Sequence, residues 1–217
     1  MCSLNVQNKK RRQAYPVVEE VLKAHFQNRD IIGIEIGVLG GSWTAYMLDR
    51  LPNLVKLYCI DPWQHIDGGH LEQNLPQDKQ DENFRDYCNK IKPHKDRVCT
   101  LRMTSDEAAE YFDPSINPNL GKVWGPVDFV YIDGNHHEDQ VYRDIINYYK
   151  AIKPGGIIMG HDYGLAEGVT KWVKHFFTHN STKNYFVGDD FVWWSYKTNH
   201  LPLPLEKQGV DYGRAEE

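Results

Sequence analysis

Two short segments of this sequence place carboxylates and imidazoles directly after runs of apolar, β-branched residues. Asp133 and His136 follow one such run, and His161 and Asp162 follow the next. These runs predict buried strands, and the ends of neighbouring parallel strands meet at one edge of a sheet. Carboxylate oxygens and imidazole nitrogens that converge there are suitable ligands for a divalent cation. The sequence therefore predicts metal-assisted chemistry at this edge.

A glycine-rich turn lies further upstream, after the first predicted strand. The turn runs from Glu35 through Gly37 to Gly41, lets a ligand approach the backbone, and leads into a helix whose first N–H groups are free. Asp61 ends the second predicted strand 20 residues after Gly41, where an acid can accept hydrogen bonds from ribose hydroxyls. Each feature alone also fits a plain joint between strand and helix, but together they favour nucleoside binding. The glycine spacing departs from the dinucleotide fingerprint and argues against a nicotinamide cofactor.

Strand-like and helix-like stretches alternate along most of the chain. Apolar runs predict strands at residues 31–36, 54–60, 97–103, 127–132, 157–159, 185–187 and 191–196. Helical periodicity predicts helices at residues 15–26, 42–51, 83–91, 106–112, 137–150 and 168–177. Parallel strands need crossover connections, so we expect an α/β fold with helices on both faces of a mostly parallel sheet. The last pair of strands would add one antiparallel strand.

Three local features carry expectations of their own. Ser105 is expected to cap the helix at 106–112. Residues 153–156 are expected to form a sharp turn that leads into the fifth strand. Because strand side chains alternate between faces, one of Trp193 and Trp194 is expected in the core and the other at the surface or an interface.

Composition limits the classes of partner. The 217 residues suit one domain, and the net charge of −5 provides no large basic field, so we expect no nucleic acid partner. No apolar run approaches membrane-spanning length and no signal peptide begins the sequence, so we expect no membrane partner and a cytoplasmic location. The four cysteines show no close pairing, which is typical of reduced thiols. We expect a basic arm at 1–14, the domain at 15–197 and a tail at 198–217.

Six segments are informative in combination: Glu35-Ile36-Gly37, Asp61-Pro62-Trp63, Asn83-Phe84, Tyr131-Ile132-Asp133-Gly134-Asn135-His136, Lys153-Pro154-Gly155-Gly156 and Gly160-His161-Asp162-Tyr163. Together they resemble the class I S-adenosylmethionine-dependent methyltransferases, in the branch of metal-dependent O-methyltransferases that includes macrocin-type sugar methyltransferases. The likeness covers residues 15 to 197. It implies a Rossmann-like, doubly wound, seven-stranded, mostly parallel sheet, with S-adenosyl-L-methionine as the cofactor.

The resemblance also implies which residues bind the cofactor. Glu35, Gly37 and Gly41 would hold its methionine end, and a side chain of the Ser42-Trp43-Thr44 stretch would meet its carboxylate. The remaining contacts would come from acids and a serine at the ends of later strands: Asp61 at the ribose, Ser105 and Asp106 near the adenine, and Asp133 beside the reacting group.

A divalent metal site is implied at Asp133, His161 and Asp162. Relatives have an acid where His161 stands. Because Mg²⁺ prefers oxygen ligands, a histidine at this position means that the metal could be Mn²⁺ as well as Mg²⁺. His161 could instead contact the metal ligands without binding the metal itself, or hydrogen-bond to the backbone at the strand end, and these alternatives stay open.

His136 is implied as the proton acceptor, because sugar-modifying relatives have a histidine at this position and catechol relatives a lysine. The function that follows is methyl transfer to a hydroxyl of a sugar or glycoside, aided by a divalent cation. Two alternatives remain open: methylation of a catechol-like aromatic hydroxyl, and a non-catalytic domain that binds a nucleoside cofactor. A homo-oligomer also remains open.

Overall fold

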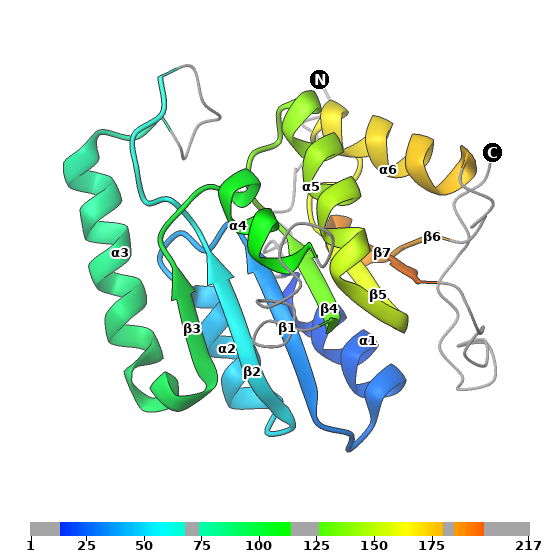
Figure 1. Ribbon diagram of the computed structural model, residues 1–217, viewed down its shortest axis with the longest axis horizontal. Helices are drawn as coiled ribbons and strands as arrows, with labels where there is room; N and C mark the ends of the chain where they lie inside the picture. Colours follow the sequence, from blue (N-terminus) through cyan, green and yellow to red (C-terminus); the bar gives the residue numbers. More distant parts are fainter. Residues whose placement is uncertain (1–13, 68–73, 114–125, 180–184, 198–217) are drawn as a thin grey trace, which may run out of the picture.

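The computed structural model describes residues 14–67, 74–113, 126–179 and 185–197, so the predicted basic arm, apart from Ala14, and the predicted tail lie outside the described residues. A seven-stranded sheet with the order β3-β2-β1-β4-β5-β7-β6 forms the centre of the molecule (Figure 1). β7 pairs antiparallel with both its neighbours, and the other described pairs are parallel. The strands are β1 Ile31–Ile36, β2 Leu54–Ile60, β3 Val98–Leu101, β4 Val127–Ile132, β5 Ile152–Gly160, β6 Tyr185–Val187 and β7 Trp193–Tyr196.

Helices cover both faces of this sheet. They are α1 Tyr15–Phe26, α2 Ser42–Arg50, α3 Gln77–Ile91, α4 Ser105–Phe112, α5 Glu138–Ala151 and α6 Glu167–His179, with short 3₁₀ turns η1 Lys92–Arg97 and η3 Asp189–Phe191. Along β4, Phe129 and Tyr131 join the core under α1, α2 and α3, whereas Val130 and Ile132 join the core under α4, α5 and α6. This alternation confirms the predicted doubly wound α/β fold. No helix among the described residues is long and apolar enough to cross a bilayer.

The structure corrects the predicted start of two helices. α3 begins at Gln77 rather than at residue 83, because its first turn is polar and carries no apolar periodicity. Ser105 is not the cap of α4. Thr104 takes this role: its hydroxyl accepts a hydrogen bond from the Glu107 N–H at 3.2 Å, and the Glu107 carboxylate accepts one from the Thr104 N–H at 2.9 Å.

Two expectations about the later strands are also wrong. Residues 153–156 lie within β5, where the pairing with β4 shifts register, rather than in a turn before it. Trp193 and Trp194 are both buried, because β7 lies inside the sheet between β5 and β6 and each of its faces is covered. Trp194 stacks on Phe186 of β6 with ring centroids 5.5 Å apart.

Candidate functional site

The predicted site residues follow strands that lie side by side in the sheet. Gly37 follows β1, Asp61 follows β2, Asp133 follows β4, and His161 and Asp162 follow β5. The strand order reverses between β1 and β4, which are neighbours in the sheet although β2 and β3 separate them in the sequence. Open α/β sheets bind ligands beyond the carboxyl ends of the strands at such a switch point.

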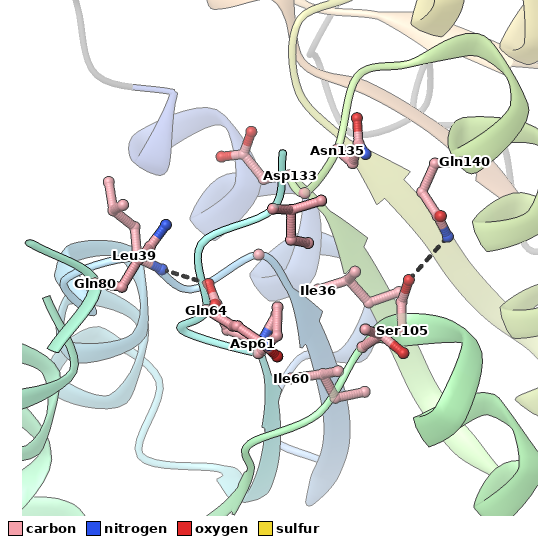
Figure 2. A pocket seen from close by; sticks show the side chains of 15 residues that line it. Ile36, Leu39, Ile60, Asp61, Gln64, Gln80, Ser105, Asp133, Asn135 and Gln140 are labelled. Carbon is pink, nitrogen blue, oxygen red and sulfur yellow. Dashed lines mark hydrogen bonds between the residues drawn. The ribbon is translucent and has the colours of Figure 1, made fainter. Parts of the chain in front are cut away.

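A pocket opens at this point, with about 720 Å³ of empty space that includes some open solvent. The enclosed part of this space is only about 100 Å³, so the pocket is shallow and open to solvent. Its lining comes from the ends of β1, β2 and β4, the segment after β2 and the starts of α4 and α5: Ile36, Gly37, Leu39, Ile60, Asp61, Pro62, Gln64, Ile66, Gln80, Thr104, Ser105, Asp133, Gly134, Asn135 and Gln140 (Figure 2). The structure therefore brings together four predicted cofactor residues, Gly37, Asp61, Ser105 and Asp133.

Gly37 holds two of these strand ends against each other. Its φ of +82° lies in the left-handed region, and a Cβ atom at this position would lie 2.2 Å from the Asp133 carbonyl oxygen. The Asp133 N–H in turn donates to the Ile36 carbonyl at 2.8 Å. Only a glycine allows this close approach, so Gly37 fixes where Asp133 leaves the sheet.

Asp61 shapes the glycine-rich turn. Its Oδ2 accepts hydrogen bonds from the N–H groups of Val38 and Leu39, both at 2.9 Å, and its Oδ1 accepts one from Trp63 at 2.8 Å. Burial raises the pKa of Asp61, while these three N–H donors lower it. A carboxylate offers about four acceptor positions, so roughly one remains for a ligand hydroxyl. The sequence predicted an acid for the ribose but missed its role in holding the turn.

The other residues predicted at the methionine end lie behind the pocket or outside it. Glu35 is 1% exposed, accepts a 2.6 Å hydrogen bond from the Thr44 hydroxyl, and does not line the pocket. Burial raises its pKa well above the usual range for a glutamate. Gly41 is the N-cap residue that precedes α2, with a φ of +70°. Ser42 is exposed, and its hydroxyl accepts a hydrogen bond from the Lys90 ammonium at 3.0 Å.

Ser105 and Asp106 take different positions relative to the pocket. Ser105 lines the pocket, and its hydroxyl accepts a hydrogen bond from the Gln140 amide at 3.1 Å. Asp106 lies outside the lining and pairs with the Arg143 guanidinium at 3.1 Å. Neither Gln140 nor the buried Asp144, one turn further along α5, was predicted from the sequence. The available signal was that these two polar residues lie four positions apart on a helix that also buries an apolar face.

The four predicted acids and histidines form one cluster beside the pocket. His136 Nε2 lies 3.2 Å from Asp162 Oδ2 and 3.8 Å from Asp133 Oδ1. His161 Nδ1 lies 3.2 Å from Asp162 Oδ1 and 3.7 Å from Asp133 Oδ1. Burial lowers the pKa of His161, but the hydrogen bond to Asp162 and the two carboxylate charges outweigh it, so the pKa lies above the usual histidine value.

The donor atoms of this cluster fit a divalent cation. Asp133, His136 and Asp162 can each present one ligand atom within 4.8 Å of the other two. The second nitrogen of His161 lies 3.0 Å from the Asp190 carbonyl, which fixes the ring with Nδ1 toward the acids. Two carboxylates with imidazoles suit Mn²⁺ and other transition ions as well as Mg²⁺. His136 thus lies at ligand distance, where the sequence indicated a proton acceptor alone.

A buried aromatic pair supports the acid that the pocket and the cluster share. The Tyr131 hydroxyl donates to Asp133 Oδ2 at 3.3 Å. Trp43 of α2 stacks on the Tyr131 ring with centroids 4.4 Å apart and planes 3° apart. Both rings are almost fully buried, so Asp133 extends from a rigid base.

Comparison with known proteins agrees with this architecture. A family model described as a methyltransferase domain matches residues 34–163, which include the glycine-rich turn, the pocket and the acid–histidine cluster. An uncharacterized protein of Acanthamoeba polyphaga mimivirus is 29% identical over 145 residues, which is 66% of this chain. The matched stretch spans 57% of that relative's own length.

Two solved structures share the fold. The O-methyltransferase TomG from Streptomyces achromogenes, involved in tomaymycin synthesis and solved in complex with SAM, has a TM-score of 0.58 and 13% identity, covering 85% of this chain and 79% of TomG. The MycE methyltransferase from the mycinamycin biosynthetic pathway, in complex with Mg and SAH, has a TM-score of 0.53 and 16% identity, covering 88% of this chain and 52% of MycE. Likeness at these identities shows the fold, and the match over 34–163 shows the family: the chain belongs to the methyltransferase domain family.

Proposed function

We propose that this protein is an S-adenosylmethionine-dependent O-methyltransferase that uses a divalent cation and methylates a hydroxyl of a sugar or glycoside. One observation carries the proposal. Asp133 lines the pocket at the switch point and also belongs to the acid–histidine cluster. A methyl donor in the pocket and a hydroxyl at the cluster would therefore meet at this residue.

The pocket suits the adenosyl part of the cofactor. Ile36 and Ile60 provide apolar surface for a flat base, and Asp61 keeps one acceptor position for a ribose hydroxyl. Gly37 allows the backbone to come close to a ligand. The presence of SAM in TomG and of SAH in MycE supports this assignment by likeness of fold. Bound SAM supplies an electrophilic methyl group.

The cluster suits the acceptor hydroxyl. Asp133, His161 and Asp162 would hold the cation, and the Mg in the MycE complex supports a metal in this fold. A cation held there would supply Lewis-acid stabilisation of the alkoxide form of a hydroxyl. His136 is the proposed proton acceptor, because its Nε2 faces both carboxylates and a neutral imidazole takes up a proton near neutral pH. The carboxylates then stabilise the imidazolium that forms.

A phenolic acceptor is the second candidate, and an exposed aromatic ring favours it. Phe191 is 42% exposed and accepts a 3.1 Å hydrogen bond through its carbonyl from the Tyr163 N–H. The preceding residue, Asp190, contacts His161 at 3.0 Å. The backbone of Phe191 thus lies near the cluster, and its exposed ring could stack on a flat acceptor or on the apolar face of a sugar ring.

Two measurements test the proposal. Isothermal titration with S-adenosylhomocysteine should give saturable binding, and NAD should not bind. Binding of NAD alone would exclude S-adenosylmethionine as the cofactor. Transfer of a radiolabelled methyl group should then occur to glycosides in a panel of mono- and oligosaccharides, with catechols beside them. Transfer to catechols alone would replace the first acceptor class by the second.

A further inference from the structure

The turn between β6 and β7 lies against the segment that follows β5, which carries His161 and Asp162. β7 pairs antiparallel with β5 so that Trp193 lies opposite Gly160, the last residue of β5 (Figure 1). The 3₁₀ turn η3 ends two residues before Trp193. The register of two strands that are distant in the sequence therefore brings η3 to His161.

Two consecutive carbonyl groups of this turn hold the residues on either side of Asp162. The Asp190 carbonyl lies 3.0 Å from His161 Nε2, and the Phe191 carbonyl accepts a hydrogen bond from the Tyr163 N–H at 3.1 Å. Asp162 itself has a φ of +61°, and its Oδ1 lies 3.2 Å from His161 Nδ1. The turn therefore helps to orient both side chains that this segment contributes to the acid–histidine cluster.

The backbone of the turn has an unusual conformation. Asp190 has a φ of +40° and Phe191 a φ of +60°, in the left-handed region that residues with a side chain, and bulky ones above all, rarely adopt. Such strain persists where surrounding contacts fix the backbone, here the two carbonyl contacts and a 2.8 Å hydrogen bond from the Gly188 N–H to the Val192 carbonyl. A relaxed turn would move the Asp190 carbonyl away from His161.

A histidine at this position needs such a contact, whereas an acid does not. A carboxylate has lone pairs on both oxygens, but a neutral imidazole has one lone pair, on whichever nitrogen lacks the hydrogen. A carbonyl only accepts, so the Asp190 carbonyl requires the hydrogen on His161 Nε2 and leaves the lone pair on Nδ1. Nδ1 then faces Asp162 and Asp133 at 3.2 and 3.7 Å, an arrangement that a cation between them would stabilise.

We propose that the left-handed turn at Asp190 and Phe191 positions His161 for metal binding, by holding its ring in the Nε2–H tautomer with the Nδ1 lone pair toward a divalent cation at Asp133 and Asp162. The inference rests on the proposed function, because the cation is part of it. In this role the two turn residues act through the His161 ring and not by contact with the cation. Partners of a metal ligand's second nitrogen typically account for about tenfold to 100-fold in metal affinity.

Affinity for Mn²⁺, measured by electron paramagnetic resonance on the full chain, tests this role independently of methyl transfer. Phe191→Pro should weaken Mn²⁺ binding by about tenfold to 100-fold, because the φ of proline, about −65°, excludes the left-handed conformation and moves the Asp190 carbonyl away from His161. Phe191→Asn is the matched control. Asparagine also removes the ring but tolerates a left-handed backbone, so the Mn²⁺ affinity should stay close to that of wild type.

The same substitution in a His161→Asp background separates positioning from damage to the fold. Aspartate carries an oxygen on Cγ, where histidine carries Nδ1, and its carboxylate has no tautomers to select. Phe191→Pro should therefore change the Mn²⁺ affinity of this background by less than about twofold. An equal loss in both backgrounds, or no loss in either, overturns the inference.

Phe191→Val provides a second route if Phe191→Pro does not fold, because β-branched residues rarely adopt a positive φ. It should weaken Mn²⁺ binding when His161 is present and not in the His161→Asp background, and an unchanged affinity overturns the inference. Absence of Mn²⁺ binding to the wild-type protein contradicts the metal of the proposed function instead, so the two failures are distinguishable.

Discussion

Asp144 combines a fully buried carboxyl with a pKa of about 7, against 3.8 for the unperturbed group. Its Oδ2 has no hydrogen-bond partner in the described part of the chain, so burial outweighs the bond that Oδ1 receives from Gln140. Ionisation of a carboxyl that is buried in this way lowers the free energy of unfolding. This buried carboxyl therefore makes the stability of the fold depend on pH.

We predict the sign of that dependence. The folded protein holds the Asp144 proton more tightly than the unfolded chain does, so the group's contribution to the free energy of unfolding is fully present below pH 3.8 and is lost as pH rises to about 7. Between pH 5 and pH 8 the wild-type protein should lose about 2 kcal/mol relative to Asp144→Asn, which cannot ionise. Urea denaturation of both proteins at the two pH values measures this difference. An equal change in the free energy of unfolding of the two proteins between the two pH values would contradict this prediction.

At the scale of elements, three strands are joined at the edge of the sheet opposite the site. Asp128 of β4 accepts hydrogen bonds from the Ile32 N–H of β1 at 2.8 Å and from the Lys153 ammonium of β5 at 2.9 Å. Its other oxygen pairs with Arg29 at 3.1 Å. The side chain is 1% exposed, so this buried carboxylate depends on all three partners.

Asp128→Ala should lower the free energy of unfolding by about 3 kcal/mol, because it leaves the Ile32 N–H without its acceptor and removes the charge that pairs with Arg29 and Lys153. Chemical denaturation measures this loss. Affinity for S-adenosylhomocysteine should stay within about twofold of wild type, since the pocket lies at the other ends of these strands. Asp30→Ala, at an exposed position nearby, is the control and should change neither quantity. A stable Asp128→Ala protein would show that the ion pairs contribute little.

For the whole molecule, the sheet topology brings two chemically different regions together. The pocket draws on β1, β2 and β4, and the acid–histidine cluster draws on β4 and β5. The reversal of strand order between β1 and β4 makes these regions neighbours, with Asp133 at their border. Removal of a metal from the cluster should therefore impair methyl transfer more than it impairs cofactor binding in the pocket.

Chelation with EDTA should abolish methyl transfer while S-adenosylhomocysteine still binds with an affinity within about tenfold of the untreated protein, because Asp133 is the one pocket residue that also belongs to the cluster. Addition of Mn²⁺ or Mg²⁺ should restore transfer. Activity assays and isothermal titration on the same sample measure both effects. Full turnover after thorough chelation would remove the metal from the mechanism.

The sequence by itself determined the order of strands and helices, the doubly wound fold and the positions of Asp61, Asp133, His161 and Asp162 at strand ends, because apolar runs and the residues that end them are local signals. It did not determine where side chains point. Ser42 meets Lys90 from 48 residues away, and Gln140 meets Ser105 from 35 residues away. Contacts between residues so far apart leave no periodicity in the chain.

Burial was also decided only by the tertiary structure. Glu35 carries the same local pattern whether it faces a ligand or the core, and the packing of α2 placed it against Thr44. The resemblance to sugar-modifying relatives indicated His136, yet its 3.2 Å approach to Asp162 depends on the pairing of β4 with β5. Local sequence fixes which groups are available, and the pairing of distant strands fixes which of them meet, because that pairing sets the distances on which hydrogen bonds and metal coordination depend.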